Sequence, residues 1–235
     1  MSRLLRAAAP ALIAALLLLQ VQYAGGCGSS PVEPAEGARE AVEASLRALH
    51  ERAAYRFQLE VQTWIGVSGY TVYGDEKGEG FLEDGEFSLS VLSSSPAGEE
   101  ILTIFSQEGA VYSKENGETK AIDPGDMPNR LYDPRNFTKV LTEYGDPVSE
   151  GVQVDGGATF RVYLLELSSA RAQDILSGPA WEYFSNLRFE VRCRVWVGEG
   201  SAPPARLVLE LVGYDPQESL QRYRSLITLR PEPPT

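Results

Sequence analysis

The chain has 235 residues, of which 43% are hydrophobic, and its 21 basic and 33 acidic side chains give a formal net charge of −12. This length suits one large domain or two small ones, and the hydrophobic fraction is sufficient for a substantial core. An acidic surface repels phosphate backbones and anionic lipid, so we expect neither nucleic-acid binding nor adsorption to an anionic membrane surface.

Residues 1–26 have the three-part layout of a signal peptide. Arg3 and Arg6 supply positive charge, an apolar run from Ala7 to Leu19 is interrupted only by Pro10, and small residues follow. The apolar run is shorter than the roughly 20 residues that a membrane-spanning helix needs. We therefore predict that this leader directs the chain across a membrane and is then removed. Because it carries two basic residues and no acidic one, its removal changes the net charge from −12 to −14.

Cys27 follows the leader in the stretch Tyr23-Ala24-Gly25-Gly26-Cys27. This stretch resembles the lipobox of bacterial lipoproteins, in which the cysteine thiol receives a diacylglycerol and becomes the new N-terminus. Ala24 stands where that motif usually has leucine. The resemblance implies a lipoprotein on the extracytoplasmic face of a bacterial membrane, because two acyl chains at ~0.8 kcal/mol per buried CH₂ make a protein membrane-resident. The alternative is cleavage after Gly26 by an ordinary signal peptidase, which would give a fully secreted protein.

Residues 27–37 are rich in Gly, Ser, Pro and Glu, which predicts a flexible tether in front of a single domain at 38–235. The second cysteine, Cys193, alternates with apolar residues such as Val191 and Val195, so we expect it to face the core as a small apolar side chain. The alternative is a disulfide between Cys27 and Cys193 in an unlipidated, secreted protein.

The first regular element of the predicted domain is an amphipathic helix over 36–53, in which Val42, Leu46 and Leu49 recur at helical spacing. From Tyr55 onward apolar and polar residues alternate, as in a strand with one buried face. Turn residues at 83–85, 96–98, 108–109 and 116–117 divide the segments, which predicts an antiparallel meander. The strands expected in this half are 55–62, 70–82, 86–92, 100–106 and 110–114.

Two helical insertions interrupt the strands. The first is predicted to begin at Pro134, with Asp133 as its cap, and to run to about Tyr144. The second contains a helix that begins after Ser168 or Ser169 and is broken at Gly178-Pro179, and a bulky patch at 181–187 follows the break. The strands expected around these insertions are 148–154, 158–167, 188–197, 205–212 and 220–230, and the turn Asp155-Gly156-Gly157 is predicted to join the first two.

These elements predict an α+β fold in which about ten antiparallel strands form one strongly curved sheet, an incomplete β-barrel. The N-terminal helix and the two insertions would cover its concave face. Three helical segments cover a curved apolar face poorly. The space between them and the sheet must therefore be filled either by their own side chains or by a hydrophobic ligand.

The order of elements over about 36–229 resembles that of the LolA-like lipoprotein carriers and the mycobacterial LppX/LprG-type lipid-binding lipoproteins. The likeness rests on the first helix and its following strand Tyr55 to Val61, the hairpin ending in Gly109-Ala110-Val111-Tyr112, the Asp133-Pro134 helix, the strand with Tyr163, and the pair Val195-Trp196-Val197-Gly198 and Pro203-Pro204-Ala205-Arg206-Leu207. It implies a half-barrel with helices as a lid over a cavity for acyl chains. It supplies no ligand residue that can be carried over to this chain.

The candidate ligand site consists of bulky residues on the two insertions, which could form a mobile lid over a lipid cavity. Their alternative role is to cap the sheet as ordinary core. The residues are Phe137, Leu141 and Tyr144 on the first insertion and Trp181, Tyr183 and Phe184 on the second.

Catalytic and metal chemistry have little support in the sequence. His50 is the sole histidine, and no G-x-S-x-G sequence accompanies it. Residues 75–86 match part of a calcium-loop pattern, but Lys77 stands at a ligand position and the flanks look like strands. We therefore predict no enzyme activity, no metal and no cofactor.

The leading hypothesis is a monomeric, membrane-anchored cell-envelope lipoprotein that binds or relays a hydrophobic acyl or lipid ligand between the curved sheet and the helices. The alternative hypothesis is a structural or sensory envelope lipoprotein that binds a protein partner and has no ligand cavity.

Overall fold

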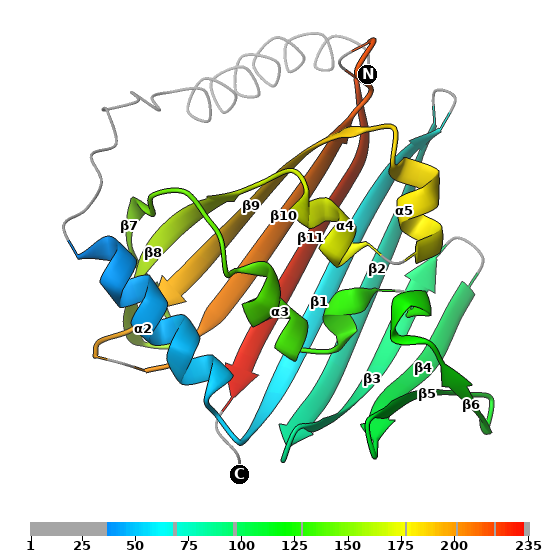
Figure 1. Cartoon of the computed structure of the whole chain (residues 1–235), viewed down its shortest axis with the longest axis horizontal. Coiled ribbons are helices and arrows are strands. Elements are labelled where there is room, and N and C mark those ends of the chain that lie inside the picture. The colour runs from blue at the N-terminus through cyan, green and yellow to red at the C-terminus, as the bar shows by residue number, and fades with distance from the viewer. Residues whose placement is uncertain are drawn as a thin grey trace, which may run out of the picture. The chain divides into compact units, whose positions relative to one another are not determined.

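The computed structural model describes residues 37–232, except residues 68–69, 96–97, 128, 177, 201 and 219. Within this part of the chain, eleven strands form one open antiparallel sheet in the order β6-β5-β4-β3-β2-β1-β11-β10-β9-β8-β7 (Figure 1). The strands are β1 (Ala54–Val67), β2 (Tyr70–Glu83), β3 (Glu86–Ser95), β4 (Gly98–Gln107), β5 (Ala110–Glu115), β6 (Glu118–Ile122), β7 (Val148–Asp155), β8 (Ala158–Leu167), β9 (Arg188–Val197), β10 (Arg206–Tyr214) and β11 (Gln221–Glu232). The sheet is therefore two meanders that meet where β1 pairs with β11, and it corresponds to an incomplete barrel.

Short turns set the register of the meanders. Four hairpins have two-residue turns in which both central residues have positive φ: Asp84-Gly85, Glu108-Gly109, Asn116-Gly117 and Gly156-Gly157. Positive φ at both positions is the signature of the type I′ turn, whose twist matches that of the strands it joins. The turns predicted from these dipeptides are confirmed.

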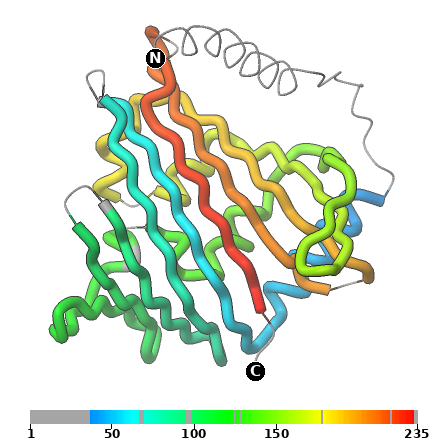
Figure 2. Tube along the Cα trace, turned by 180° about the vertical axis from the view of Figure 1, so that it is seen from behind, coloured from blue at the N-terminus to red at the C-terminus, as the bar shows by residue number. Residues whose placement is uncertain are grey.

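The helical elements lie over one face of the sheet (Figure 1), and the reverse view shows the strands of the other face uncovered (Figure 2). They are α2 (Ala38–His50), η1 (Pro124–Asp126), η2 (Arg130–Tyr132), α3 (Arg135–Val140), α4 (Arg171–Ile175) and α5 (Gly178–Phe184). No helix in the described part of the chain is both long enough and apolar enough to cross a membrane.

The core lies between these helices and the inner face of the sheet. Alternate residues of the central strands point inward, as in Phe57, Leu59 and Val61 of β1, all of which are buried. On β2 the inward positions include Gly78 and Gly80, and the close approach of Phe57 and Leu89 fills the space where their side chains would be. Cys193 is free and fully buried in this core, which confirms the expected direction of its side chain. Cys27, the leader 1–26 and the tether up to residue 36 lie outside the described residues.

The outer face of the C-terminal half carries a ladder of opposite charges across the strands. Arg224 and Glu210 lie 2.7 Å apart, Arg194 and Glu150 2.8 Å, and Arg230 and Glu60 3.3 Å between their charged atoms. Such half-exposed pairs contribute little stability each, but they keep this face polar and solvated. The alternation predicted for these strands, with one wet and one buried face, is confirmed.

Three details of the predicted elements are wrong. The first insertion helix was expected to reach Tyr144, but α3 ends at Val140, and Tyr144 instead forms an isolated antiparallel bridge with Leu167. Gly178-Pro179 was expected to end a helix and instead begins α5, where proline is tolerated because first-turn N–H groups have no helical partner. The edge strand β6 was not predicted.

Candidate functional site

A partly enclosed hollow of 170 Å³ lies between the inner face of β2, β1 and β11 and the short helices α4 and α5. The strands contribute Val61, Thr63, Ile65, Glu76, Tyr223, Ser225 and Ile227, and the covering segments contribute Asn129, Ile175, Leu176, Ala180 and Phe184. Ligand pockets usually measure ~300–1,000 Å³, so this hollow has about half the volume of a small ligand pocket.

The cover over the hollow is held by aromatic packing. Phe184 at the end of α5 lies against Tyr223 of β11 with ring centroids 4.6 Å apart, and Trp181 lies 6.1 Å from Phe189 of β9. Phe184 is buried, whereas its neighbour Tyr183 is 67% exposed. The seven-residue helix α5 is thus attached to the sheet through one face that consists of large apolar side chains.

One acidic residue, Glu76 of β2, lies on the inner face and lines the hollow. Its Oε2 accepts a hydrogen bond of 2.6 Å from the Tyr132 hydroxyl, which comes from η2 in the covering layer. Burial raises the pKa of Glu76, the Tyr132 hydrogen bond opposes this shift, and the charge of Asp75 adds to it. Burial also raises the pKa of Tyr223 to about 12. The hollow therefore combines mainly apolar side chains with one carboxylate and several neutral polar groups.

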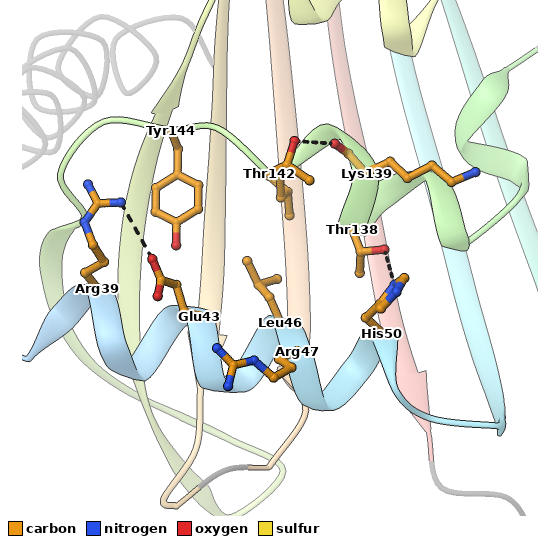
Figure 3. Close-up of a pocket in the computed structure, with 10 residues that line it drawn as sticks. Arg39, Glu43, Leu46, Arg47, His50, Thr138, Lys139, Thr142 and Tyr144 are labelled. Carbon is orange, nitrogen blue, oxygen red and sulfur yellow. Dashed lines mark hydrogen bonds and ion pairs between the residues drawn. The ribbon is translucent and has the colours of Figure 1, made fainter.

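A separate groove of 360 Å³ lies between α2 and α3 (Figure 3). Leu46 of α2 and Leu141 after α3 form its apolar part, and Tyr144 points toward α2 with a buried hydroxyl that has no hydrogen-bond partner among the described residues. Arg39, Arg47 and Lys139 lie on its rim with Glu43. His50 is exposed here, and its Nδ1 lies 3.3 Å from the Thr138 hydroxyl.

The outer face of the sheet has a third depression, of 430 Å³, over β1 to β4. Its lining combines the exposed apolar side chains of Leu92 and Ile101 with the charged side chains of Glu60, Lys77 and Glu79. No described helix covers it, so it is an open surface depression and not an enclosed pocket.

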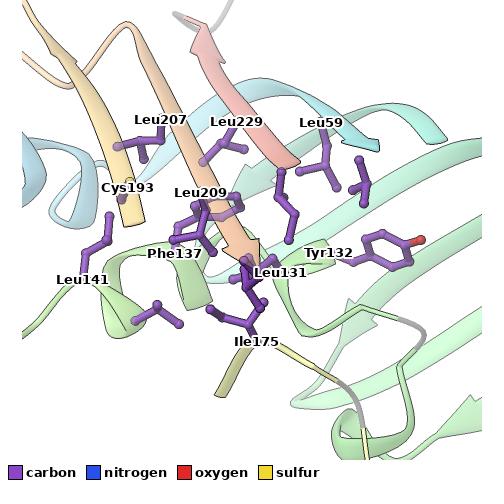
Figure 4. Packing of buried hydrophobic residues seen from close by; sticks show 14 of the residues in the cluster. Leu59, Leu131, Tyr132, Phe137, Leu141, Ile175, Cys193, Leu207, Leu209 and Leu229 are labelled. Atoms are coloured by element: carbon purple, nitrogen blue, oxygen red, sulfur yellow. The ribbon is translucent and has the colours of Figure 1, made fainter. Parts of the chain in front are cut away.

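The structure does not bring the six predicted site residues into one cavity. Phe137 is fully buried in the core with Leu209 and Cys193 (Figure 4). Leu141 and Tyr144 line the groove between α2 and α3, whereas Phe184 lines the hollow. Trp181 packs against Phe189 beside the hollow, and Tyr183 is largely exposed, with its ring edge-on to that of Phe184.

Glu76 was missed in the sequence because it lies in the acidic stretch Asp75-Glu76-Lys77, which looks like a polar strand. The alternation of side chains along β2 could have revealed its position. Glu76 is two residues from Gly78 and six from Leu82, so it shares the inner face on which both of these are buried. The segment 75–86 lies in the β2–β3 hairpin and not in a helix-flanked loop. Among the described residues no group of three or more His, Cys, Asp or Glu is arranged to bind a metal ion.

Comparisons with known proteins identify the fold. No protein-family model and no curated protein matches the chain. Among solved structures, LprF from Mycobacterium bovis is similar over 86% of this chain and 96% of its own, with 13% identity and a TM-score of 0.52. The lipoprotein LppX of Mycobacterium tuberculosis is similar over 84% of this chain and 94% of its own, with 12% identity and a TM-score of 0.50. At this identity the likeness concerns the fold alone, and it confirms the resemblance to the LppX type at that level.

Proposed function

We propose that this protein is a non-enzymatic lipoprotein of the bacterial cell envelope that binds or relays a hydrophobic ligand between its sheet and the α4–α5 cover. The observation that carries the proposal is the hollow beneath α5, which is bounded on one side by the apolar inner face of an open sheet. The fold similarity to LppX, a lipoprotein, supports it.

The volume of the hollow makes movement of the cover part of the proposal. At 170 Å³ the hollow is too small for a lipid with long acyl chains. Helix α5 has only seven residues, and its attachment to the sheet through Phe184 and Trp181 is largely apolar. An incoming acyl chain offers the same kind of contact, so it can replace these side chains at the sheet when the cover swings away.

Anchoring would take place through Cys27, after removal of residues 1–26, with residues 27–37 as a tether to a single domain at 38–235. The net charge of −12 supports a covalent anchor, because the acidic domain is repelled by an anionic membrane surface. In this proposal the protein acts as a monomer on the extracytoplasmic face. Mass spectrometry of the mature N-terminus would distinguish a diacylglyceryl cysteine from a free one.

The outer face supports a second candidate function. Ile101 is 64% exposed next to Leu92 in the depression over β1 to β4, and charged residues surround both. A protein partner could bind there while the protein's own side chains keep the inner space filled. This is the alternative of a structural or sensory lipoprotein without a ligand cavity.

The two functions are distinguished by extraction of the native protein followed by lipid mass spectrometry, together with uptake of a fluorescent fatty acid. Binding beneath α5 predicts copurified acyl lipid that is lost when Trp181→Ala and Phe184→Ala are combined. Tyr183→Ala is the matched control, because this residue is exposed and does not line the hollow, while its ring touches Phe184 only from the outside, edge-on at 4.8 Å between centroids. The carrier function would be rejected if no lipid copurified, if delipidation left the melting temperature unchanged, and if the delipidated protein took up no fluorescent fatty acid.

A further inference from the structure

We propose that Glu76 determines which ligand the hollow accepts, and that this ligand is a long-chain amphiphile whose buried polar end is a primary ammonium group. This inference rests on the proposed function, since it names the class of molecule that would occupy the hollow beneath α5. It follows from the position of one acidic side chain at the inner surface of an otherwise mainly apolar space.

The location of Glu76 is unusual for a carboxylate. It projects from β2 to the inner face, beside Val61 of β1 in the sheet register, whereas the other acidic residues of this strand segment, Asp75 and Glu79, project to the outer face. A carboxylate at an apolar surface loses hydration, which is costly unless partners replace the water. Tyr132 supplies one such partner, and it is the one hydrogen-bond donor to Glu76 found among the described residues.

The charge balance of the hollow favours a cation. None of the described residues that line the hollow is basic, so no side chain in this lining can neutralise the charge of Glu76. The ionisable side chains around Glu76 are Tyr132, Asp75 and Tyr223, none of which can carry a positive charge. Lys77, the next residue, projects to the outer face and lies 3.4 Å from Asp75. A bound ammonium would provide the cationic donor that the protein itself does not place in the hollow.

The acceptors around Glu76 match the donors of a primary ammonium. Such a group has three N–H donors and no acceptor. The Thr63 and Ser225 hydroxyls lie 3.4 Å apart on the paired strands β1 and β11 and line the same hollow. Both hydroxyls also hydrogen-bond with Tyr223, so the hollow offers hydroxyl oxygens as further acceptors besides the Glu76 carboxylate. The charge of Glu76 disfavours a phosphate head group, and the surrounding Val61, Ile65 and Ile227 suit the first methylenes of the chain of an ammonium ligand.

The test is photolabelling of the full-length protein in nanodiscs of phosphatidylcholine, with two probes of equal length that each carry a diazirine in the chain. One probe is a dodecylamine and the other a dodecyl sulfonate, whose charge does not change with pH. The readout is the amount of label on peptides 171–184 and 221–232, which contain the cover and β11. We expect at least about tenfold more labelling by the amine than by the sulfonate, as a charge-assisted hydrogen bond of about 1.5–3 kcal/mol implies.

Two variants locate the effect. Glu76→Gln keeps the shape and loses the charge, and it should reduce labelling by the amine about tenfold. Glu79→Gln removes the same charge from the outer face of the same strand and should leave the labelling unchanged. If Glu76→Gln does not fold, the wild-type protein is labelled at decreasing pH, and protonation of Glu76 should reduce labelling by the amine but not by the sulfonate.

The outcomes separate this inference from the proposed function. Equal labelling by both probes, unchanged by Glu76→Gln or by pH, would overturn the role of Glu76 while lipid binding beneath α5 stands. Labelling of these peptides by neither probe would overturn both.

Discussion

Gly80 of β2 provides a sharp test of how the inner face is packed. A Cβ at this position would lie 2.5 Å from Cζ of Phe57 and 2.5 Å from the backbone oxygen of Ser88. The phenyl ring is fully buried and the backbone oxygen belongs to the neighbouring strand, so neither can move away at low cost. Adding a methyl group to so tight a contact typically costs about 1–3 kcal/mol.

We therefore expect Gly80→Ala to lower the free energy of unfolding by about 1–3 kcal/mol, and the melting temperature by about 2–4 °C per kcal/mol for a protein of this size. Gly74→Ala on the same strand is the control, because nothing lies within 4 Å of its added Cβ. That variant should be neutral or up to about 1 kcal/mol more stable, since alanine has less freedom than glycine in the unfolded chain. Urea denaturation of the two variants gives the comparison. Equal stability of both would refute the close packing of Phe57 on β2 that the fold requires.

Three further predictions concern buried polar groups. Burial raises the pKa of the Cys193 thiol to about 12, so iodoacetamide at pH 8 should modify the Cys193 peptide only when the protein is unfolded, and rapid native modification would contradict this burial. Tyr132→Phe should cost about 1.5–3 kcal/mol near neutral pH, because the Glu76 carboxylate loses its donor; a loss below about 0.5 kcal/mol in urea denaturation would show that the bond is unimportant. Burial raises the pKa of Glu76 above its ordinary value of 4.5, so its contribution to stability is full below that pH and is lost as pH rises through the folded-state pKa. The stability of Glu76→Gln relative to wild type should thus increase with pH above about 4.5, and a constant difference would argue against a buried carboxyl.

The strands could be predicted from sequence where two signals agree. Alternation of apolar and polar residues marks β1 and β9, and dipeptides such as Asn116-Gly117 mark the turns, because few residues accept the positive φ that a two-residue hairpin needs. The edge strand β6 has neither an alternating pattern nor a buried face, since four of its five residues are exposed. Its strand conformation depends on pairing with β5, which local sequence does not reveal.

The candidate site was predicted only in part. Bulky residues on the insertions marked the covering layer, but composition could not tell Phe184, which is buried over the hollow, from Tyr183, which faces solvent. The different exposure of these two residues depends on helix α5 starting at Gly178. The Gly178-Pro179 sequence suggests instead that a helix ends there. The volume of the hollow depends on how side chains from distant strands fit together, and no local pattern carries that information.

A crystal structure of the protein with a bromine-labelled acyl chain tests the central claim most directly, because anomalous scattering locates the bromine without assumptions about the ligand pose. Binding beneath the cover predicts a bromine peak between Ile227 and the segment 175–184, with α5 displaced from Tyr223 to make room. Bromine on the outer face beside Leu92 and Ile101, with the hollow closed and α5 in place, would contradict it.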